Sequence, residues 1–407
     1  MSELQQGAVE VAQVLRDAGY EVFYAGGSVR DLLLGLEPKD FDLVTNATPK
    51  QIDGLFRKTV LVGANFGVVR VLWSKRREYE VATYRREGKY TDGRRPDEVI
   101  YSNSREEDVQ RRDFTINALL MDPFSKEIFD FVSGEEDLQK KEIRAVGHAE
   151  TRFQEDRLRL LRAIRFAARF SFQIESETYE SICRNAQFLR EVSVERIVAE
   201  LDGIWKCSHP TFGYNLLVDS GLAQAIFPEL TEDGHATVKK WMSNVGQPLQ
   251  GNADQRIIVY WSMLASFQDV ESLEDWLVGF KFARARIKAI QRTLALHRTL
   301  KVFSSASLAE QMRVVRDERF EEASLLFQVT DPTEQSTIQR CGELLIDLKE
   351  SPLPSMPLID GKDLAKIGFR PGPIFKRILR EVEDQVLERK IRLKSEAEEW
   401  ILSKKWD

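Results

Sequence analysis

The sequence contains few of the residues that build covalent or metal-held scaffolds. Its three cysteines are odd in number and far apart, which argues against both a disulfide framework and a thiolate zinc site. Its four histidines form no histidine–aspartate dyad, so we see no sign of a phosphohydrolase domain and interpret all four as structural. These residues are Cys183, Cys207, Cys341, His148, His209, His235 and His297.

Long apolar runs are also missing. No stretch approaches the roughly eighteen apolar residues that a membrane-spanning helix needs. The N-terminal segment MSELQQGAVEVAQVLRDAGY mixes acidic residues with amphipathic spacing, unlike a signal or transit peptide. We therefore expect a soluble, cytoplasmic protein.

The charge balance excludes a protein that is basic over its whole surface. The 407 residues include 59 Lys and Arg against 65 Asp and Glu, a net charge of −6. A local basic stripe can still bind phosphates on an acidic chain. The stretch 281–301, KFARARIKAIQRTLALHRTLK, contains seven Lys and Arg residues and no acid. It is either a nucleic-acid contact or a solvated helix face that also packs a core.

The pattern of elements predicts an α+β protein: a small mixed α/β head followed by an elongated helical part. Strand patterns occur at EVFYAGG, FDLVT, TVLVGANFGVVRVLW and REYEVATYR, all within the first 130 residues. Residues 86–108 are polar and rich in turn formers, which predicts a long loop. Beyond about residue 155 apolar residues recur at helical spacing and strand signals stop.

Two aspartates and a glycine-rich turn are the first candidates for a site. Asp40 and Asp42 alternate in KDFDLV, so a strand would place both carboxylates on one face, where a divalent cation relieves their repulsion. Upstream, Gly27 and Ser28 follow a strand and begin a helix, which leaves backbone N–H groups for an anion. Arg30 lies in the first turn. The alternatives are two solvated acids and a Ser28 that only caps the helix.

Further candidates follow along the chain. Glu80, on the strand EYEVATYR, is the best third carboxylate, although a surface ion pair with Arg76 or Arg77 is an equal alternative. In the segment RRDFTINA, Arg112 and Asn117 have the chemistry to meet a triphosphate or ribose, and Asp113 can cap a helix.

The segment EDRLRLLRAIR suggests a base reader. On one helix, Asp156, Arg159 and Arg162 would lie on one face, and Arg165 would continue it. An aspartate accepts from the amino group of cytosine or adenine, whereas uracil and guanine present a carbonyl there; one mismatch costs roughly 1–3 kcal/mol. A ladder of ion pairs on a solvated helix is the alternative.

Together these segments resemble the class II tRNA nucleotidyltransferases, the CCA-adding enzymes of the polymerase β superfamily. The similar stretches are YAGGSVRDLLLG, PKDFDLVT, EVATYR, RRDFTINAL, DFVSGEEDL, EDRLRLLRAIRFAARF and VERIVAEL, and the tail GKDLAKIGFRPGPIFKRILREV is also similar. The resemblance implies template-independent addition of C, C and A to the 3′ end of tRNA from CTP and ATP.

The resemblance also implies roles for individual residues. Asp40 and Asp42 would hold Mg²⁺, with Glu80 as a third catalytic carboxylate. Asp156 and Arg159 would pair with the base. The other nucleotide-binding residues would be Gly27, Ser28, Arg30, Arg112, Asp113, Asn117, Arg162 and Arg165, and Asp130, Gly134 and Asp137 match a hinge-like segment of the family.

The family organisation suggests a catalytic head over 1–130, a neck over 131–205, a body over 206–300 and a tail over 301–407, with the helical parts holding the acceptor and T stem of tRNA. Bacterial poly(A) polymerases share the head motifs, but their Arg-rich stretch ending in His-Val is replaced here by LVGANFGVV. The loop REGKYTDGRRPDEV argues against an enzyme that adds only C. An enzyme that adds only A stays open.

Overall fold

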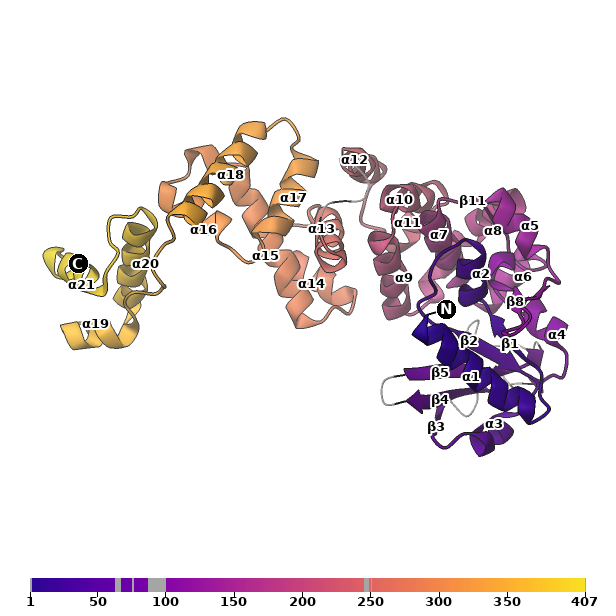
Figure 1. Ribbon diagram of the computed structural model, residues 1–407. Helices are drawn as coiled ribbons and strands as arrows, with labels where there is room; N and C mark the ends of the chain where they lie inside the picture. The colour runs from indigo at the N-terminus through magenta and orange to yellow at the C-terminus, as the bar shows by residue number, and fades with distance from the viewer. Residues whose placement is uncertain are drawn as a thin grey trace. The chain divides into compact units, whose positions relative to one another are not determined.

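The computed structural model describes residues 2–62, 67–74, 77–86, 100–244, 249 and 251–406 (Figure 1). Residue contacts divide the chain into two compact units, Met1–His235 and Ala236–Asp407. Residues 87–99, the centre of the predicted long loop, lie outside the described residues. The division into head, neck, body and tail stays a prediction.

The first unit contains all the strands that the structure describes. In chain order its elements are α1 (Glu3–Asp17), β1 (Val22–Ala25), α2 (Gly27–Leu33), β2 (Asp42–Thr45), α3 (Pro49–Leu55), β3 (Thr59–Val62), β4 (Val68–Ser74), β5 (Arg77–Thr83), β6 (Arg85–Arg86), β7 (Ile100–Tyr101), α4 (Arg105–Gln110), the 3₁₀ turn η1 (Thr115–Asn117), β8 (Leu120–Met121), β9 (Ile128–Phe129), α5 (Gly134–Lys140), β10 (Glu142–Ile143), α6 (Ala149–Glu155), α7 (Arg159–Phe170), β11 (Gln173–Ile174), α8 (Ser176–Asn185), the 3₁₀ helix η2 (Ala186–Glu191), α9 (Val194–Lys206), α10 (Pro210–Asp219) and α11 (Leu222–Ile226).

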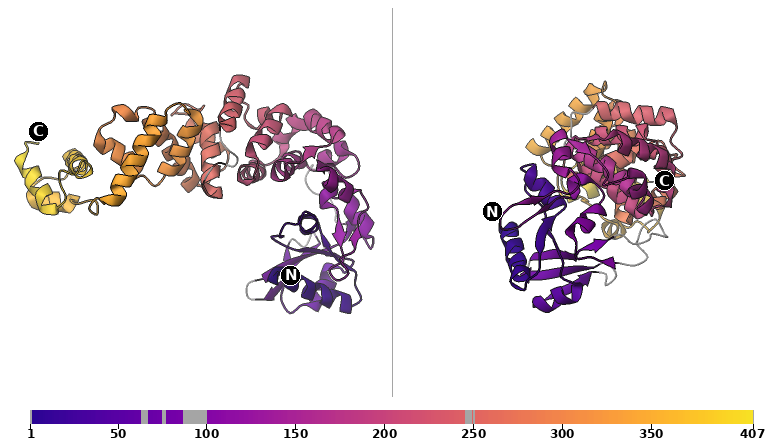
Figure 2. Two further views of the ribbon diagram at one scale, coloured as in Figure 1. Left: turned by 45° about the horizontal axis from the view of Figure 1, so that its top comes forward. Right: turned by 90° about the vertical axis from the view of Figure 1, so that its right-hand side faces the viewer.

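A seven-stranded mixed sheet forms the core of the N-terminal part, in the order β3-β4-β5-β2-β1-β8-β9. Strand β2 pairs antiparallel with β1, with Asp42 opposite Ala25, and parallel with β5, with Leu43 opposite Val81. Helix α1 contacts β1 and β5, and α3 contacts β4 and β5 (Figures 1 and 2). Every residue of β1 is buried, which explains its unbroken run of apolar and aromatic side chains.

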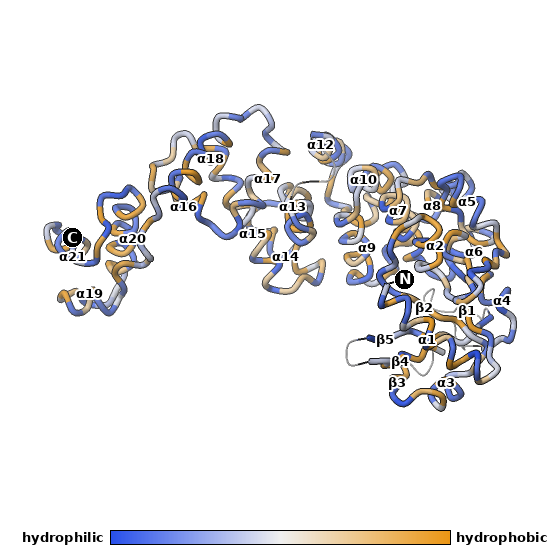
Figure 3. Tube along the Cα trace, viewed as in Figure 1, coloured by the Kyte–Doolittle hydropathy of each residue, from blue (hydrophilic) through white to orange (hydrophobic). Residues whose placement is uncertain are grey.

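Helices α7 and α9 pack against each other beside this sheet region. Both helices mix hydrophobic and hydrophilic residues, and Figure 3 shows orange and blue segments following one another along α9. The apolar side chains of α7, among them Leu161 and Ile164, are buried, and its arginines follow the opposite stripe. One face of α7 is therefore available to form a polar surface.

Two local expectations differ from the structure. The predicted loop ends earlier than residue 108, because α4 begins at Arg105, where the Ser104 hydroxyl accepts the Glu107 N–H at 3.3 Å. A short strand, β11, follows α7 and pairs in parallel with β10, although the sequence predicted no strand beyond residue 155. With only two residues, β11 is too short to show a period in the sequence.

Helices are the only regular secondary structure among the described residues of the second unit. Helix α12 (Glu232–Ser243) begins in the first unit and ends in the second. The remaining elements are α13 (Ala253–Ala265), α14 (Leu273–Gly279), α15 (Arg284–Leu300), the 3₁₀ turn η3 (Phe303–Ser305), α16 (Leu308–Val315), α17 (Phe320–Thr330), α18 (Gln335–Glu350), α19 (Gly361–Ile367), α20 (Pro373–Leu387) and α21 (Lys394–Ser403). The predicted fold class, a mixed α/β part followed by helices, is confirmed.

Most of the basic stretch 281–301 forms α15. Ile287 and Ile290 are buried, whereas Arg284 and Lys288 are exposed. The stretch thus packs a core and also presents basic residues to solvent, as the sequence suggested. Among the described residues, no helix is long and apolar enough to cross a membrane.

Candidate active site

The predicted site residues come together around one pocket of about 540 Å³ in the first unit. Eleven of the thirteen predicted residues line it; Ser28 and Glu80 do not. Nine basic and five acidic residues contribute to the lining, so the pocket suits an anionic ligand. The eleven are Gly27, Arg30, Asp40, Asp42, Arg112, Asp113, Asn117, Asp156, Arg159, Arg162 and Arg165.

Asp40 and Asp42 lie at the start of β2, on the pocket wall. Asp42 is the first residue of the strand, and Asp40 precedes it. Burial, followed by the neighbouring charges of Asp40 and Glu80, raises the pKa of Asp42 to about 6, and Arg112 opposes the shift. Carboxylates that repel one another in this way fit a divalent cation. Within the described ranges, however, no group of three or more His, Cys, Asp or Glu side chains is arranged around a metal position.

Glu80 stands apart from this pair. It precedes Val81 on β5 as Asp42 precedes Leu43 on β2, so the parallel register makes the two acids neighbours. Its carboxylate pairs with Arg70 on the adjacent strand at 3.2 Å, and about half of its side chain is exposed. The surface ion pair that the sequence allowed therefore exists, although with Arg70. The catalytic role of Glu80 stays a prediction.

The turn between β1 and α2 contributes the backbone of Gly26 and Gly27 to the pocket lining. Gly26 has φ +68°, and a Cβ there would lie 3.2 Å from the Arg112 Nη1 atom, so this position requires glycine. Gly26 also occupies the N-cap position, so the alternative that Ser28 caps α2 is wrong. The Ser28 hydroxyl instead donates to the Ala25 carbonyl at 3.1 Å.

Arg30 is almost fully buried beneath this turn. Its guanidinium donates to Asp31 at 2.6 and 2.8 Å and to the side-chain oxygen of Asn117. Asp31 in turn accepts from Arg169 of α7 at 3.0 Å. Only 3% of Arg30 is exposed. The structure therefore shows Arg30 as a support that joins α2, η1 and α7.

Asp108, on α4, holds both arginines of the RRD segment. It is completely buried and accepts from Arg111 at 2.7 Å, from Arg112 at 3.0 Å and from the backbone N–H of Arg85 at 3.2 Å. Burial alone would raise its pKa, but Arg112 and Arg111 outweigh burial and lower it. Asp108 was not predicted as a site residue, because the segment 86–108 was expected to form a loop. The signal was its i,i+3 and i,i+4 spacing to the two arginines.

Asp113 connects the same segment to α7. Its Oδ2 atom accepts from Arg162 at 2.6 and 2.8 Å, and its Oδ1 atom accepts from the N–H of Phe114 and from Asn117. Burial opposes ionisation of Asp113, but Arg162 more than compensates, so the pKa of Asp113 is lowered. Both carboxylate oxygens accept hydrogen bonds from within the protein, so Asp113 links η1 to α7.

The predicted position of Asp156 on the reader helix is wrong. Helix α6 ends at Glu155 and α7 begins at Arg159, and Asp156 has extended backbone angles between them. Aspartate side chains form hydrogen bonds with nearby backbone N–H groups, which disfavours them in a helix interior. Here the Oδ1 atom of Asp156 accepts from the N–H of Leu158 at 3.0 Å. Asp156 nevertheless lines the pocket together with Arg159.

The arginines of α7 are held by acidic partners. Arg159 donates to Glu155 at 2.6 Å, and Arg165 donates to Glu200 of α9 at 2.5 Å. Each guanidinium is therefore oriented before a ligand arrives. The lining also includes residues that the sequence analysis did not select, namely Gly26, Asp31, Lys39, Arg111, Leu158, Phe166, Arg169 and Arg196.

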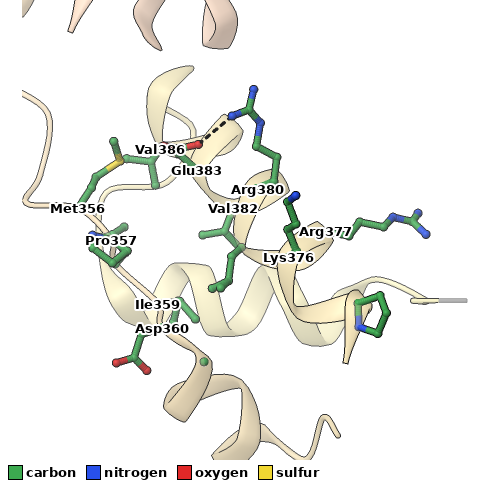
Figure 4. A pocket seen from close by; sticks show the side chains of 14 residues that line it. Met356, Pro357, Ile359, Asp360, Lys376, Arg377, Arg380, Val382, Glu383 and Val386 are labelled. Carbon is green, nitrogen blue, oxygen red and sulfur yellow. Dashed lines mark ion pairs between the residues drawn. The ribbon is translucent and has the colours of Figure 1, made fainter. Parts of the chain in front are cut away.

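A second, larger cavity of about 890 Å³ lies in the C-terminal unit, between α20 and the segment that leads into α19 (Figure 4). Its floor is mainly apolar, with Met356, Ile359 and Val382, and Arg380 at its edge pairs with Glu383 at 3.7 Å. None of the predicted site residues lies there.

The fold and the pocket define a nucleotidyltransferase. Residues 22–144 match the poly A polymerase head domain, and residues 171–233 match the probable RNA and SrmB-binding site of polymerase A. Residues 254–401 match the putative domain 2 of tRNA nucleotidyltransferases. Head and helical parts of the chain therefore both resemble enzymes that extend RNA.

The chain belongs to the family of CCA-adding enzymes. It is 34% identical to the CCA-adding enzyme of Levilactobacillus brevis, over 94% of this chain and 93% of the relative. It is 33% identical to that of Lactococcus lactis, over 95% and 94%. The family assignment made from the sequence motifs is confirmed, and the protein is a CCA-adding nucleotidyltransferase.

Solved structures agree with this assignment. The Bacillus stearothermophilus CCA-adding enzyme in complex with CTP matches with a TM-score of 0.82 and 27% identity, covering 99% of this chain and 98% of that chain. The Thermotoga maritima CCA-adding enzyme complexed with tRNA has a TM-score of 0.70 at 21% identity, covering 99% and 98%, and supports the fold.

Proposed function

We propose that this enzyme adds C, C and A in turn to the 3′ end of tRNA, with CTP and ATP as substrates and pyrophosphate as product, and that the pocket of the first unit is its active site. The observation that carries the proposal is the meeting of the Asp40–Asp42 pair with Asp156 and the arginines of α7 in one pocket. The relatives complexed with CTP and with tRNA support the choice of substrates.

Asp40 and Asp42 are the residues that would hold Mg²⁺. The raised pKa of Asp42 supports this role, because it reflects carboxylates whose repulsion a cation would relieve. When bound, the ion lowers the pKa of the RNA 3′-hydroxyl and neutralises charge on the departing pyrophosphate. The chain contributes no covalent nucleophile in this proposal.

The triphosphate would lie between the turn at Gly27 and the side chain of Arg112. The backbone there carries N–H groups at the start of α2, and Arg112 is fixed by Asp108. Arg30, Asp113 and Asn117 would act mainly by holding these groups in place. Arg162 and Arg165 would hold the segment 155–165 in place or add positive charge near the phosphates.

Base selection would fall to Asp156 and Arg159. The carboxylate accepts from the exocyclic amino group of C or A, and the guanidinium donates to the ring acceptor beside it. Uracil and guanine would place a carbonyl oxygen against the carboxylate. The same pair would thus serve both CTP and ATP without a nucleic-acid template.

The helical parts, including the predicted body and tail, would hold the acceptor and T stem of tRNA. The family model matched by residues 254–401 supports this assignment. Since ATP, CTP and tRNA are substrates that occur together in the cytoplasm, we place the enzyme there.

Single-nucleotide incorporation by the purified protein tests the proposal. The substrates are tRNA transcripts that end before CCA, after C and after CC, each given one NTP and Mg²⁺. We expect CTP to be used on the first two and one ATP on the third, and Asp42→Ala to abolish addition while tRNA still binds. ATP addition to the CC-ended tRNA alone would mean an A-adding enzyme, and long A tails on any RNA would mean a poly(A) polymerase.

A further inference from the structure

Helix α9 contacts residues of the pocket lining from two positions one turn apart. Arg196 lines the pocket and donates to the Oδ2 atom of Asp156 at 2.7 Å. Glu200 is buried and accepts from Arg165 at 2.5 Å, with Arg162 3.9 Å away. One face of α9 therefore pairs Arg196 with Asp156, and Glu200 with Arg165 and Arg162.

The contact with Arg196 is the long-range anchor of Asp156. The Asp156 carboxylate also accepts a local hydrogen bond, from the N–H of Leu158 two residues away. Because Asp156 lies between two helices, the helical backbone does not set its direction. A carboxylate held at one oxygen can still turn about its side-chain bonds, whereas one held at both oxygens presents its remaining lone pairs in a fixed direction.

Helix α9 packs closely against α7 at Gly203. Gly203 faces the Arg165 side chain so closely that a Cβ there would lie 2.4 Å from the Arg165 Cδ atom. The side chains of Arg196 and Asp156 are 24% and 19% exposed, so surrounding protein restricts them while one side remains open to the pocket.

We propose that Arg196 is a positioning residue that determines nucleotide specificity: it fixes the Asp156 carboxylate in the orientation that accepts an amino group and rejects a carbonyl. This inference rests on the proposed function of Asp156 as base reader. Without Arg196, the carboxylate can turn away from an opposing carbonyl oxygen, so UTP and GTP meet less repulsion. The loss therefore falls on discrimination more than on the chemical step.

The test is the kcat/KM of full-length variants for each of the four NTPs on tRNA transcripts. In Arg196→Met, which keeps the length of the side chain but removes its donors, we expect the UTP/CTP ratio to rise roughly tenfold or more. The change should appear mainly in KM. Arg196→Lys, which keeps the charge and one donor direction, should restore part of the selectivity. Arg190→Met is the matched control, because Arg190 is an exposed arginine of η2 outside the pocket lining. The UTP/CTP ratio of this variant should stay at the wild-type value.

Two further measurements separate this inference from the proposed function. In an Asp156→Ala background, Arg196→Met should change the NTP ratios no further, because the residue it positions is gone. A folded Arg196→Met enzyme with unchanged ratios, or with an equal loss for all four NTPs, overturns the role of Arg196. If Asp156→Ala itself retains full selection for C and A, the base-reader function of Asp156 fails instead. Arg196→Lys provides the decisive ratio if Arg196→Met does not fold.

Discussion

Asp42 illustrates how single residues of the pocket depend on their neighbours. Its pKa is raised to about 6 by burial and by the charges of Asp40 and Glu80. At neutral pH it is mostly ionised, and at pH 5 it is mostly protonated. A protonated carboxyl group is a poor ligand for Mg²⁺.

The Mg²⁺ concentration needed for half-maximal nucleotide addition should therefore rise as the pH falls below about 6, by roughly tenfold per pH unit. Incorporation assays between pH 5 and 8 measure this. Glu80→Gln removes one of the charges that raise the pKa, so it should move the midpoint to lower pH while the activity at pH 8 remains. Loss of activity at every pH in Glu80→Gln would instead support the catalytic role predicted for Glu80, and a flat Mg²⁺ requirement would contradict the assignment of Asp42 to the metal.

Residues that stand in short sequence motifs could be predicted as site residues from the sequence alone. Asp40, Asp42 and Arg159 stand in short patterns whose chemistry is visible without coordinates, and all three line the pocket. Their partners were harder to predict, since the contact of Arg196 with Asp156 joins residues 40 positions apart. The helix break at Asp156 was also missed, because apolar periodicity continues across it and a carboxylate that bonds a nearby backbone N–H leaves no periodic signal.

At the level of elements, the start of α5 forms a tight joint with η1. The Asp130 carboxylate accepts three backbone N–H groups, those of Val132, Gly134 and Glu135, at 2.9–3.0 Å. A Cβ on Gly134 would lie 2.3 Å from the carbonyl oxygen of Thr115. The hinge-like segment suggested by the family resemblance is thus closely packed on the 3₁₀ turn that bears Asn117.

Gly134→Ala should lower the free energy of unfolding by about 1–3 kcal/mol, because a backbone carbonyl cannot move aside as a flexible side chain can. Urea denaturation with and without CTP measures the loss. Gly54→Ala, in α3, is the matched control: nothing lies within 4 Å of the added methyl group, so stability should hold or rise slightly. Equal stability of the two variants would mean that the joint tolerates a shift.

On the scale of the whole chain, all residues that line the pocket proposed as the active site belong to the first unit. The second unit has its own apolar clusters, one of them formed by α19, α20 and α21. Strand order in the first unit could not be deduced from the sequence, because β2 pairs with β5 across two intervening strands. The change from strands to helices along the chain, in contrast, follows from the period of apolar residues and was predicted.

A fragment of residues 1–243, which keeps α12 whole, should therefore fold and bind CTP within a fewfold of the full chain's affinity. Its affinity for tRNA should fall by about tenfold or more, because it lacks the basic face of α15 and the predicted tail. Thermal shift with CTP and titration with labelled tRNA measure the two affinities. Full tRNA affinity in the fragment would contradict the role proposed for the C-terminal helices.

The pairing of pocket arginines with Asp31, Asp108, Asp113, Glu155 and Glu200 bears on product release. Guanidiniums that already share their charge with carboxylates attract a polyanion but retain it less strongly than unneutralised ones would. We expect pyrophosphate to leave more readily after each addition for this reason, which would help an enzyme that completes three cycles on one tRNA. We therefore expect the acids that orient the pocket to ease product release as well.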